Sequence, residues 1–397
     1  MNQLCWCGNP DLRDFSPGYW RCDICSTLIS KSFPSGDITA ITDEDGDFYG
    51  KKYWLEHQVE KLGLETIEQR SRSDLLDRCG WWLAKLLEFS LPPAQLLEIG
   101  CSHGGFLGLA ELAGFRVTGI ELSPWVADFA RQSFGVDVRT GPIERQVFQR
   151  GSFDAICMFD VLEHLQDPVR TLECCAHALT PNGVLLVQTP QYPVRTDLGE
   201  LQEAKHPFLK MLLPDEHLFL FSDESVKRLL SEVGFPTYEF LPARFAHYDM
   251  MFVAAKGLLS GNPVRTQLEA LEKSASGRLT RGFLSSFQQN IELQAQRNDL
   301  HASLGRAYQD VERLHGWLAD ARTEADDRRK DADDRLQVIE RLSEELRQAY
   351  AERDQLRIER DQLRIERDEL RERTTIRGLS KHLVKQLISG IKRKPLP

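Results

Sequence analysis

The 397-residue sequence lacks any run of 18 apolar residues, and no apolar segment follows a basic start at its N-terminus. The first absence argues against a transmembrane helix, and the second against a secretory signal peptide. An excess of positive charge is also absent. The formal net charge of −10 argues against a general nucleic-acid-binding protein. We therefore expect a cytoplasmic protein with reduced thiols, whose nine cysteines need a role other than disulfide formation.

Between residues 96 and 256, apolar strand-like runs alternate with helical periods, which is typical of a parallel α/β sheet. We predict five strands joined by helices, at 95–100, 116–122, 136–141, 153–161 and 183–190. Two further strands, 237–243 and 250–256, lie too close in sequence for a crossover and should pair antiparallel. The helix before them begins at a capping box formed by Ser222 and Ser225.

The stretch LLEIGCSHGGF (96–106) is a predicted strand that ends in a turn of small residues. Ligands bind at the carboxyl ends of parallel strands, and Gly100 and Gly104 let the backbone approach a ligand closely. Ser102 stands where a dinucleotide-binding loop has its second glycine, which disfavours NAD. Glu121 ends the next strand, where a carboxylate can accept hydrogen bonds from both ribose hydroxyls of an adenosine.

Taken in order, these segments resemble the motifs of class I S-adenosylmethionine-dependent methyltransferases. The matching stretches are LLEIGCSHGGF, GIELS, GSFDAICMFDVLEHLQDP, LTPNGVLLVQTP and DEHLFLFSDESVKRLLSEVGF. The resemblance covers about residues 94–257. It implies an α/β fold, with a Rossmann-like seven-stranded sheet that ends in an antiparallel hairpin.

The resemblance also implies S-adenosylmethionine as the cofactor. Its binding residues would lie at the strand ends: Glu98, Gly100, Ser102, Gly104, Glu121, Leu122, Ile143 and Phe159. The sequence departs from the family pattern at residues 101–103, where a second glycine is frequent. We expect Cys101 and His103 to be tolerated there, with His103 facing solvent.

Methyl transfer is an in-line displacement at a sulfonium methyl, so the enzyme must align the nucleophile and, for a hydroxyl, remove its proton. The candidate catalytic residues are Asp160, His164 and His217, although either histidine could instead have a structural role. The last hairpin offers a further candidate base and two candidate substrate contacts, His247, Tyr248 and Arg244.

Four cysteines near the N-terminus form a C-x-C pair and a C-x₂-C pair: Cys5, Cys7, Cys22 and Cys25. Four thiolates in two close pairs suit a tetrahedral structural Zn²⁺; the alternative is four unliganded thiols. Such segments are similar to the small zinc ribbons that precede sugar methyltransferase domains. The cluster DFYGKKYW (47–54), farther along the chain, either covers the active site or only packs against it.

A heptad pattern runs from Leu293 to Leu370 and predicts about 115 Å of continuous helix. Arg353, Arg360 and Arg367 interrupt its apolar seam. A coiled coil would imply self-association, as a dimer or a trimer; the alternative is a single solvated helix. The tail 376–394 is basic and amphipathic, so it could be a membrane-surface helix or a docking helix for a protein.

The order of a methyltransferase domain, a coiled coil and a basic amphipathic end is similar to that of bacterial enzymes that methyl-cap surface polysaccharides. We expect O-methylation of a sugar hydroxyl in bacterial surface-glycan biosynthesis, peripherally at the inner face of the cytoplasmic membrane. The alternatives are C-methylation of a nucleotide-linked deoxysugar and a coiled-coil scaffold with an inactive head; the sugar and the position stay open. The expected segments are a zinc-ribbon-like 1–30, a helical lid 31–93, the methyltransferase domain 94–257, a linker 258–289, a coiled coil 290–373 and a basic tail 374–397.

Overall fold

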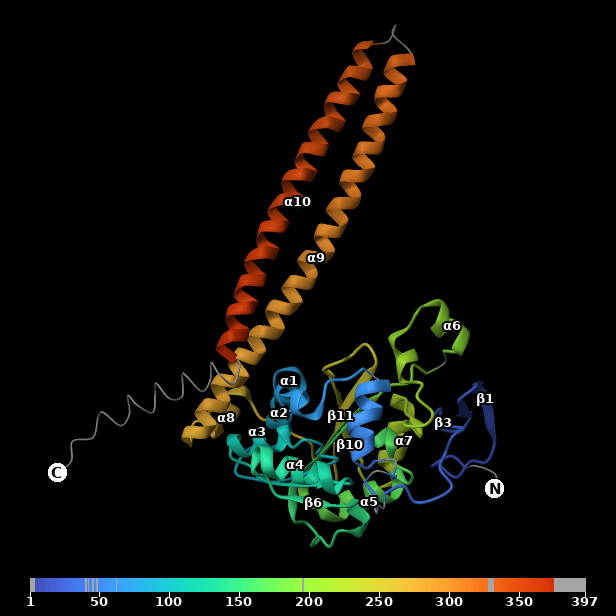
Figure 1. Cartoon of the computed structure of the whole chain (residues 1–397), viewed down its shortest axis with the longest axis vertical. Helices are drawn as coiled ribbons and strands as arrows, with labels where there is room; N and C mark the ends of the chain where they lie inside the picture. The colour runs from blue at the N-terminus through green and yellow to red at the C-terminus, as the bar shows by residue number, and fades with distance from the viewer. Residues whose placement is uncertain are drawn as a thin grey trace, which may run out of the picture. The chain divides into compact units, whose positions relative to one another are not determined.

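The computed structural model describes residues 4–374, apart from residues 40, 42, 45, 48, 62, 195 and 328–331. The chain divides into two units, Met1–Gly282 and Phe283–Pro397, which we describe separately (Figure 1). The three expected segments 1–30, 31–93 and 94–257 thus pack into one unit. The boundary between the units falls within the expected linker 258–289.

A seven-stranded sheet forms the centre of the first unit, in the order β10-β11-β8-β7-β4-β5-β6. The five strands from β4 to β8 are parallel, and β11 pairs antiparallel with both β8 and β10. This confirms the predicted Rossmann-like sheet and its final antiparallel hairpin. The strands are β4 (Gln95–Ile99), β5 (Arg116–Glu121), β6 (Val138–Thr140), β7 (Phe153–Phe159), β8 (Leu179–Pro190), β10 (Thr237–Leu241) and β11 (Asp249–Ala255).

The crossover helices lie where the periodicity predicts them. They are α3 (Gly105–Ala113), α4 (Pro124–Phe134), α5 (Pro168–Ala178) and α7 (Asp223–Glu232). Ser222 and Ser225 form the predicted capping box at the start of α7. In both α4 and α5, a proline occupies the first turn, where its missing N–H leaves no helical hydrogen bond unmade.

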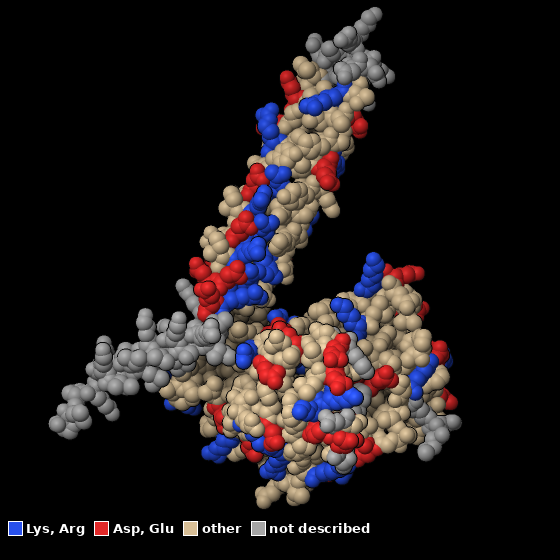
Figure 2. Space-filling model, in the orientation of Figure 1, with Lys and Arg blue, Asp and Glu red and all other residues tan. Residues whose placement is uncertain are grey.

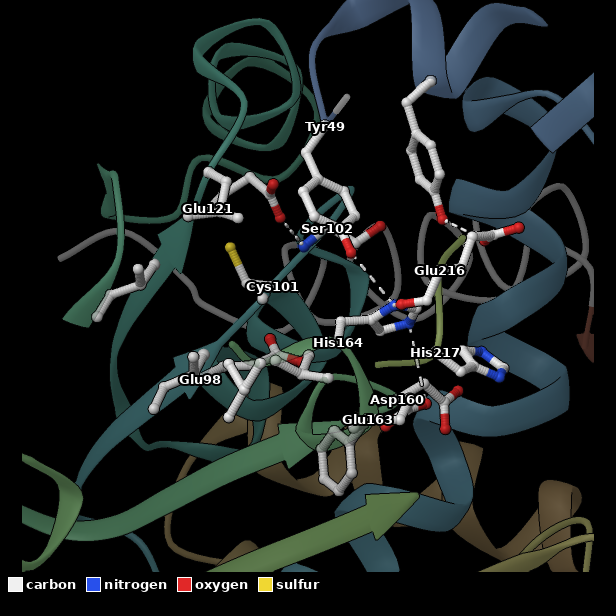
Figure 3. Close-up of a pocket in the computed structure, with 18 of the residues that line it drawn as sticks. Tyr49, Glu98, Cys101, Ser102, Glu121, Asp160, Glu163, His164, Glu216 and His217 are labelled. Atoms are coloured by element: carbon white, nitrogen blue, oxygen red, sulfur yellow. Dashed lines mark hydrogen bonds and ion pairs between the residues drawn. The ribbon is translucent and has the colours of Figure 1, made fainter. Parts of the chain in front are cut away.

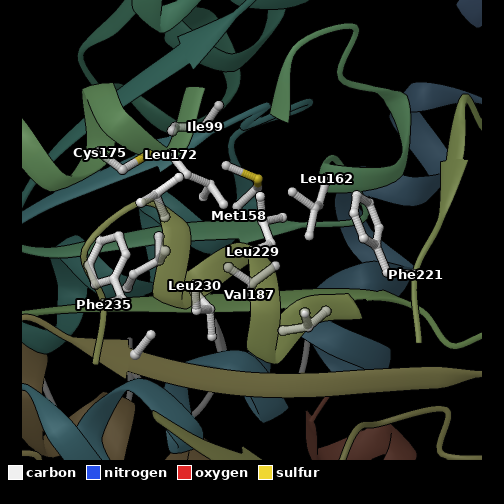
Figure 4. Close-up of a cluster of buried hydrophobic side chains, with 14 of the residues drawn as sticks. Ile99, Met158, Leu162, Leu172, Cys175, Val187, Phe221, Leu229, Leu230 and Phe235 are labelled. Carbon is white, nitrogen blue, oxygen red and sulfur yellow. The ribbon is translucent and has the colours of Figure 1, made fainter. Parts of the chain in front are cut away.

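Helices cover both faces of the sheet. Successive side chains of a strand point to opposite faces of the sheet, so the side chains of Met158 and Phe159 in β7 lie on opposite faces. Met158 packs with Leu172 of α5 and Leu229 of α7 in a large apolar cluster (Figure 4). On the other face, the Phe159 ring stacks on Trp82 of α2 (Gly80–Phe89), with 4.3 Å between ring centroids.

The N-terminal segment forms a small antiparallel sheet that borrows one strand from the central domain. Its own strands are β1 (Leu12–Ser16), β2 (Tyr19–Cys22) and β3 (Leu28–Ser30), and β3 pairs with β9 (Phe219–Leu220). Cys5, Cys22 and Cys25 lie in the same apolar cluster as Phe219. The segment is therefore anchored on the central domain both by backbone hydrogen bonds and by apolar contacts.

Further short elements connect these parts. Before the sheet come η1 (Tyr53–Lys61), α1 (Ile67–Asp74) and η2 (Leu75–Cys79). Single turns η3 (Ile143–Arg145) and η4 (Leu162–His164) follow β6 and β7. Between β8 and β9 lie α6 (Leu198–Glu203) and η5 (Pro207–Met211), and α8 (Val264–Leu271) follows β11.

The second unit is a pair of helices packed against each other, which corrects the expectation of one continuous rod. The helices α9 (Ala275–Asp327) and α10 (Ala332–Thr374) are about 80 and 65 Å long and lie side by side (Figure 1). Leu314 and Leu318 of α9 pack on Leu342 and Leu346 of α10. The helices are antiparallel, because residues near 310 meet residues near 350. The apolar seam is thus covered within the chain, and self-association stays a prediction.

The three arginines that interrupt the heptad seam are only 16–27 % exposed, and each pairs with the aspartate that follows it. The Arg353 guanidinium also lies over the rings of Tyr308 and Tyr350, which joins the two helices. Acidic and basic side chains alternate along the visible face of the pair (Figure 2). The basic tail 376–394 lies outside the described residues. Among the described helices, none has the length and apolarity needed to cross a membrane.

Replacing Leu346 by alanine should destabilise the helical pair by about 2 kcal/mol, because Leu346 is buried against α9. The matched control Leu336→Ala removes an exposed side chain of the same helix and should change stability by less than about 0.5 kcal/mol. Thermal unfolding followed by far-ultraviolet circular dichroism compares the two variants. Equal effects would contradict the packing of α10 on α9.

Candidate active site

A cavity of about 940 Å³ opens at the carboxyl ends of the central parallel strands. Its wall is formed by the loops after β4, β5, β6 and β7, by residues between β3 and β4, and by the loop before β9. This is where an open parallel sheet binds its ligand, because neighbouring loops diverge there. Figure 3 shows the residues that line it.

The loop after β4 has the conformation that its glycines predict. Gly100 and Gly104 have φ angles of +70° and +81°, which other residues rarely adopt. A Cβ atom on Gly104 would also lie 2.8 Å from the Ala130 Cβ of α4. Ser102 has a positive φ of 50° and lines the cavity. The loop therefore presents backbone to a ligand, as the sequence indicates.

Two predicted cofactor carboxylates lie at the base of this loop. Glu121 accepts hydrogen bonds from the backbone N–H groups of Ser102 and Ser123, at 3.0 and 3.2 Å. Glu98 is buried, and its Oε2 has no hydrogen-bond partner in the described part of the chain. Burial raises the pKa of both carboxyls, and Glu121 adds to the shift at Glu98. Glu98 therefore has an unused acceptor for a donor on a ligand.

The other predicted cofactor residues line the same cavity: Leu122, Ile143 and Phe159. Ile143 lies in the turn after β6, where an apolar side chain can cover a purine face. Of the eight predicted cofactor-binding residues, all but Gly104 line the cavity, and Gly104 approaches Ala130 of α4 instead. Their contact with a cofactor stays a prediction.

His103 does not face solvent, and the expectation of an exposed ring is wrong. Its side chain is only 6 % exposed, and its Nε2 lies 3.0 Å from the Asp74 carboxylate of α1. Its Nδ1 accepts a hydrogen bond from the backbone N–H of Gly105. Because Nδ1 accepts, Nε2 must carry the proton that bonds Asp74. The histidine therefore ties the cofactor loop to α1.

Asp160 follows β7 and has a positive φ of 56°, a strained conformation for a residue with a side chain. Two side chains hold its carboxylate: Gln188 donates to Oδ1 at 3.0 Å, and Arg78 donates to Oδ2 at 3.2 Å. The Asp160 carboxylate is thus fixed at the cavity wall by groups from β8 and η2. Because both carboxylate oxygens already accept hydrogen bonds, the contacts favour a positioning role for Asp160.

The structure brings the predicted His164 and His217 together, with 5.0 Å between ring centroids. The Nδ1 of His164 lies 2.8 Å from the Glu216 carbonyl oxygen, and that of His217 lies 2.7 Å from the Met211 carbonyl oxygen. A carbonyl oxygen only accepts, so each Nδ1 carries a proton. Burial lowers the pKa of each ring to about 4. Both rings are therefore neutral at pH 7, with an acceptor at Nε2.

Sequence reasoning missed two buried acids beside these histidines. Glu163 is 1 % exposed and accepts a hydrogen bond from the Thr189 hydroxyl at 2.8 Å. Burial raises its pKa well above the usual range, and Asp160 adds to the shift. Asp249, at the start of β11, has its pKa raised to about 8 by burial and by Asp160. Glu163 could have been noticed from its position directly before His164.

The segment after β3 covers one side of the cavity, so the cluster DFYGKKYW does more than pack against the domain. Tyr49, Tyr53 and Trp54 line the cavity. The Tyr53 hydroxyl donates a hydrogen bond to the Glu216 Oε2. The other carboxylate oxygen, Oε1, lies 2.8 Å from the His57 Nε2. Because the Glu216 carbonyl also holds His164, this covering segment is coupled to the histidine pair.

The last hairpin contributes less than expected. Tyr248 lines the cavity, whereas His247 and Arg244 are not among the described lining residues. Arg244 instead donates to the carbonyl and the carboxylate of Asp77.

The four N-terminal cysteines lie together, with all sulfur atoms within 4.8 Å of one another. The Sγ atoms are 3.4 Å apart in the pair Cys5–Cys25 and 3.6 Å apart in the pair Cys7–Cys22. Tetrahedral zinc with ~2.3 Å bonds needs sulfurs ~3.8 Å apart, so the cluster fits Zn²⁺ closely. The Asn9 amide donates to the Cys22 sulfur at 3.4 Å.

Comparison with known proteins identifies the domain that contains the cavity. Residues 71–239 match the model of a family described as "Methyltransferase domain". Residues 71–239 are therefore similar to methyltransferase domains. The matched range includes the loops after β4, β5, β6 and β7.

Among curated relatives, the chain is 35 % identical over 106 residues to the ubiquinone biosynthesis O-methyltransferase of Xanthomonas campestris pv. campestris. This match covers 25 % of the chain and 44 % of the relative. The protein of the same name from Xylella fastidiosa is 36 % identical over 106 residues, covering 25 % and 43 %. The chain thus spans less than half the length of these relatives.

Two solved structures are also similar. One is a possible histamine N-methyltransferase from Thermotoga maritima, with 21 % identity and a TM-score of 0.37, covering 52 % of this chain and all of that one. The other is phosphoethanolamine N-methyltransferase 2 from Haemonchus contortus in complex with S-adenosyl-L-methionine. Its identity is 14 % and its TM-score 0.40, covering 52 % of this chain and 60 % of that one.

Replacing Gly104 by alanine should destabilise the methyltransferase domain by about 2–4 kcal/mol, because it adds a clash with α4 to the cost of a positive φ. Gly135→Ala is the matched control. Gly135 has a φ of +73° with nothing within 4 Å of an added Cβ, so the backbone term alone should cost about 1–2 kcal/mol. Urea unfolding followed by tryptophan fluorescence measures both; a Gly104 effect no larger than the control's would refute the close approach.

Proposed function

We propose that the protein transfers the methyl group of S-adenosylmethionine to a hydroxyl oxygen. The observation that carries the proposal is the pair of neutral imidazoles, His164 and His217, in the wall of the cofactor cavity. Each presents an unprotonated Nε2, which suits hydrogen bonding to a hydroxyl. The two curated relatives are also named as O-methyltransferases.

In the proposed reaction, the acceptor oxygen attacks the sulfonium methyl carbon from the side opposite sulfur. The new O–C bond forms as the S–C bond breaks, and the electron pair of that bond goes to sulfur. The acceptor hydroxyl gives its proton to water. His164 and His217 orient that hydroxyl, and Asp160 helps to define the wall against which it rests. Positioning of this kind supplies much of the rate enhancement in bimolecular transfers.

We propose a sugar hydroxyl as the acceptor, in the synthesis of a bacterial surface glycan. Support comes from the mixed wall, in which the rings of Tyr49, Tyr53 and Tyr248 stand beside Asp160 and the two histidines. Flat apolar faces with polar groups between them suit a carbohydrate. A phenol is the second candidate, because the relatives are named for ubiquinone biosynthesis. C-methylation of a deoxysugar would need a strong base beside an acidic carbon.

Formation of S-adenosylhomocysteine tests these alternatives. The full chain is incubated with S-adenosylmethionine and either a panel of oligosaccharides and nucleotide sugars or a panel of simple catechols. Turnover with a carbohydrate, followed by mass spectrometry of an O-methyl product, supports the sugar proposal. Turnover with catechols alone would show that the acceptor is a phenol and not a sugar. A C-methyl product would contradict transfer to a hydroxyl oxygen.

Replacing Glu121 by glutamine should weaken the binding of S-adenosylmethionine about tenfold to a hundredfold, because charged hydrogen bonds to the ribose are lost. The control Glu111→Gln removes an exposed acid of α3 and should leave the affinity unchanged. Isothermal titration calorimetry measures both dissociation constants. An unaltered affinity in Glu121→Gln would remove Glu121 from the cofactor site.

We also propose that Cys5, Cys7, Cys22 and Cys25 hold a structural Zn²⁺. The sulfur spacing and the Asn9 hydrogen bond support this. A metal there would join the turn before β1 to the end of β2 and the turn after it. Its effect on catalysis would be indirect, through β9 and the loop before it.

The zinc proposal predicts about one zinc ion per chain, lost largely in Cys22→Ser and kept in Cys174→Ser. Cys174 is a half-buried thiol of α5 outside the cluster, so it controls for cysteine removal itself. Elemental analysis of purified protein gives the metal content. A folded wild-type protein without zinc would rule the site out.

A further inference from the structure

Three side chains in the cavity wall form a group that general-base chemistry does not require. The potential ligand atoms of Glu163, His164 and His217 all lie within 4.8 Å of one another. The His164 Nε2 and the Glu163 Oε1 are 3.9 Å apart. One histidine would be enough to accept a proton, so the second imidazole and the buried carboxylate need another explanation.

Each of the three groups is held from behind by a second residue. The Nδ1–H groups of His164 and His217 donate to the backbone carbonyls of Glu216 and Met211. The Thr189 hydroxyl donates to Glu163 Oε2. Metal-ligating histidines almost always donate their other N–H in this way, which fixes the ring and turns its lone pair to the ion. The hydrogen bonds therefore leave both Nε2 lone pairs available for a shared ligand.

The burial of Glu163 points the same way. Its side chain is 1 % exposed, and it lies beside the two imidazoles. A buried carboxylate is costly unless a cation or hydrogen bonds compensate it. Arg78 reaches Asp160, but in the described part of the chain no lysine or arginine is ion-paired with Glu163. A divalent cation would compensate Glu163 directly.

We infer that Glu163, His164 and His217 form a binding site for one divalent cation beside the methyl-transfer position. The inference deepens the proposed function and rests on it. Ligands of one ion with ~2.1 Å bonds lie ~3–3.5 Å apart, so the three side chains need to close by about an ångström. Two imidazoles and a carboxylate are typical of Zn²⁺, Fe²⁺ or Mn²⁺. All three residues line the cavity, so an ion held by them would be accessible to an acceptor.

Bound at an open position, the acceptor hydroxyl would have its pKa lowered by the cation, as a metal-bound water does. Its proton would pass to water, and its oxygen would then attack the sulfonium methyl. The cation would thus supply the activation that two neutral imidazoles of low basicity supply poorly. The acceptor class that best uses such a site has two neighbouring oxygens, which can chelate the ion.

Mn²⁺ is the probe for the test, because it prefers oxygen and nitrogen ligands and binds thiolates such as the four cysteines weakly. The full chain is dialysed against EDTA and then against chelator-free buffer, and circular dichroism checks that it stays folded. Titration with MnCl₂, followed by the electron paramagnetic resonance signal of free Mn²⁺, should show one saturable site per chain. Echo-envelope modulation should detect imidazole nitrogen at the bound ion.

The variants Glu163→Gln and His217→Gln should each bind Mn²⁺ at least about tenfold more weakly. The control His177→Gln changes an exposed histidine of α5 and should bind like wild type. Absence of saturable binding in wild type, or equal binding in all variants, overturns the cation site. Calorimetry with S-adenosylmethionine on the same samples keeps the two proposals separate. Cofactor binding without Mn²⁺ binding contradicts only the cation, and loss of cofactor binding in wild type contradicts the methyltransferase proposal.

Discussion

The pairing of β3 with β9 is the contact on which the histidine site depends. It joins residues almost two hundred positions apart and fixes the loop before β9, which carries Glu216 and His217. The Tyr19 hydroxyl donates to the His217 carbonyl at 3.0 Å, and the Ser30 N–H donates to the Leu218 carbonyl. Without this backing, a loop without regular structure would have to position an imidazole by itself.

From the other side, the same loop is held by the segment that covers the cavity. Tyr53 and His57 contact the Glu216 carboxylate, while the Glu216 carbonyl receives the His164 N–H. His103 and Asp74 make a second connection, between the cofactor loop and α1. The N-terminal part of the chain therefore supports two parts of the cavity wall, the loop after β4 and the loop before β9.

The sequence was sufficient to predict the sheet, because each strand and helix shows its own period and each cap is local. Gly100, Gly104 and Glu121 could be placed for the same reason, since a strand end fixes its loop. The contacts of Glu216 and His103 could not be predicted. They depend on partners far away in sequence, and the two-residue strand β9 gives no periodic signal. The sequence does not distinguish Glu163 from a surface glutamate, because its burial depends on the folded structure.

The heptad pattern misled for a different reason. Leucines at a and d positions bury equally well against a second chain or against the same chain, so the period does not distinguish the two. The seam positions 321, 325 and 332 are alanines, whose small side chains add little apolar surface to the heptad pattern. The packing of Leu314 and Leu318 on Leu342 and Leu346 shows which alternative the chain takes.

The antiparallel course of α9 and α10 changes what this part of the chain can do as a spacer. Arg297 of α9 and Arg367 of α10 border one small cavity, so the chain returns to the end of the pair at which it entered. Two helices of about 80 and 65 Å thus give a net displacement between their outer ends that is far shorter than either helix. A rod would hold the segments at its two ends far apart, whereas this folded arm keeps residue 374 near the start of its own unit.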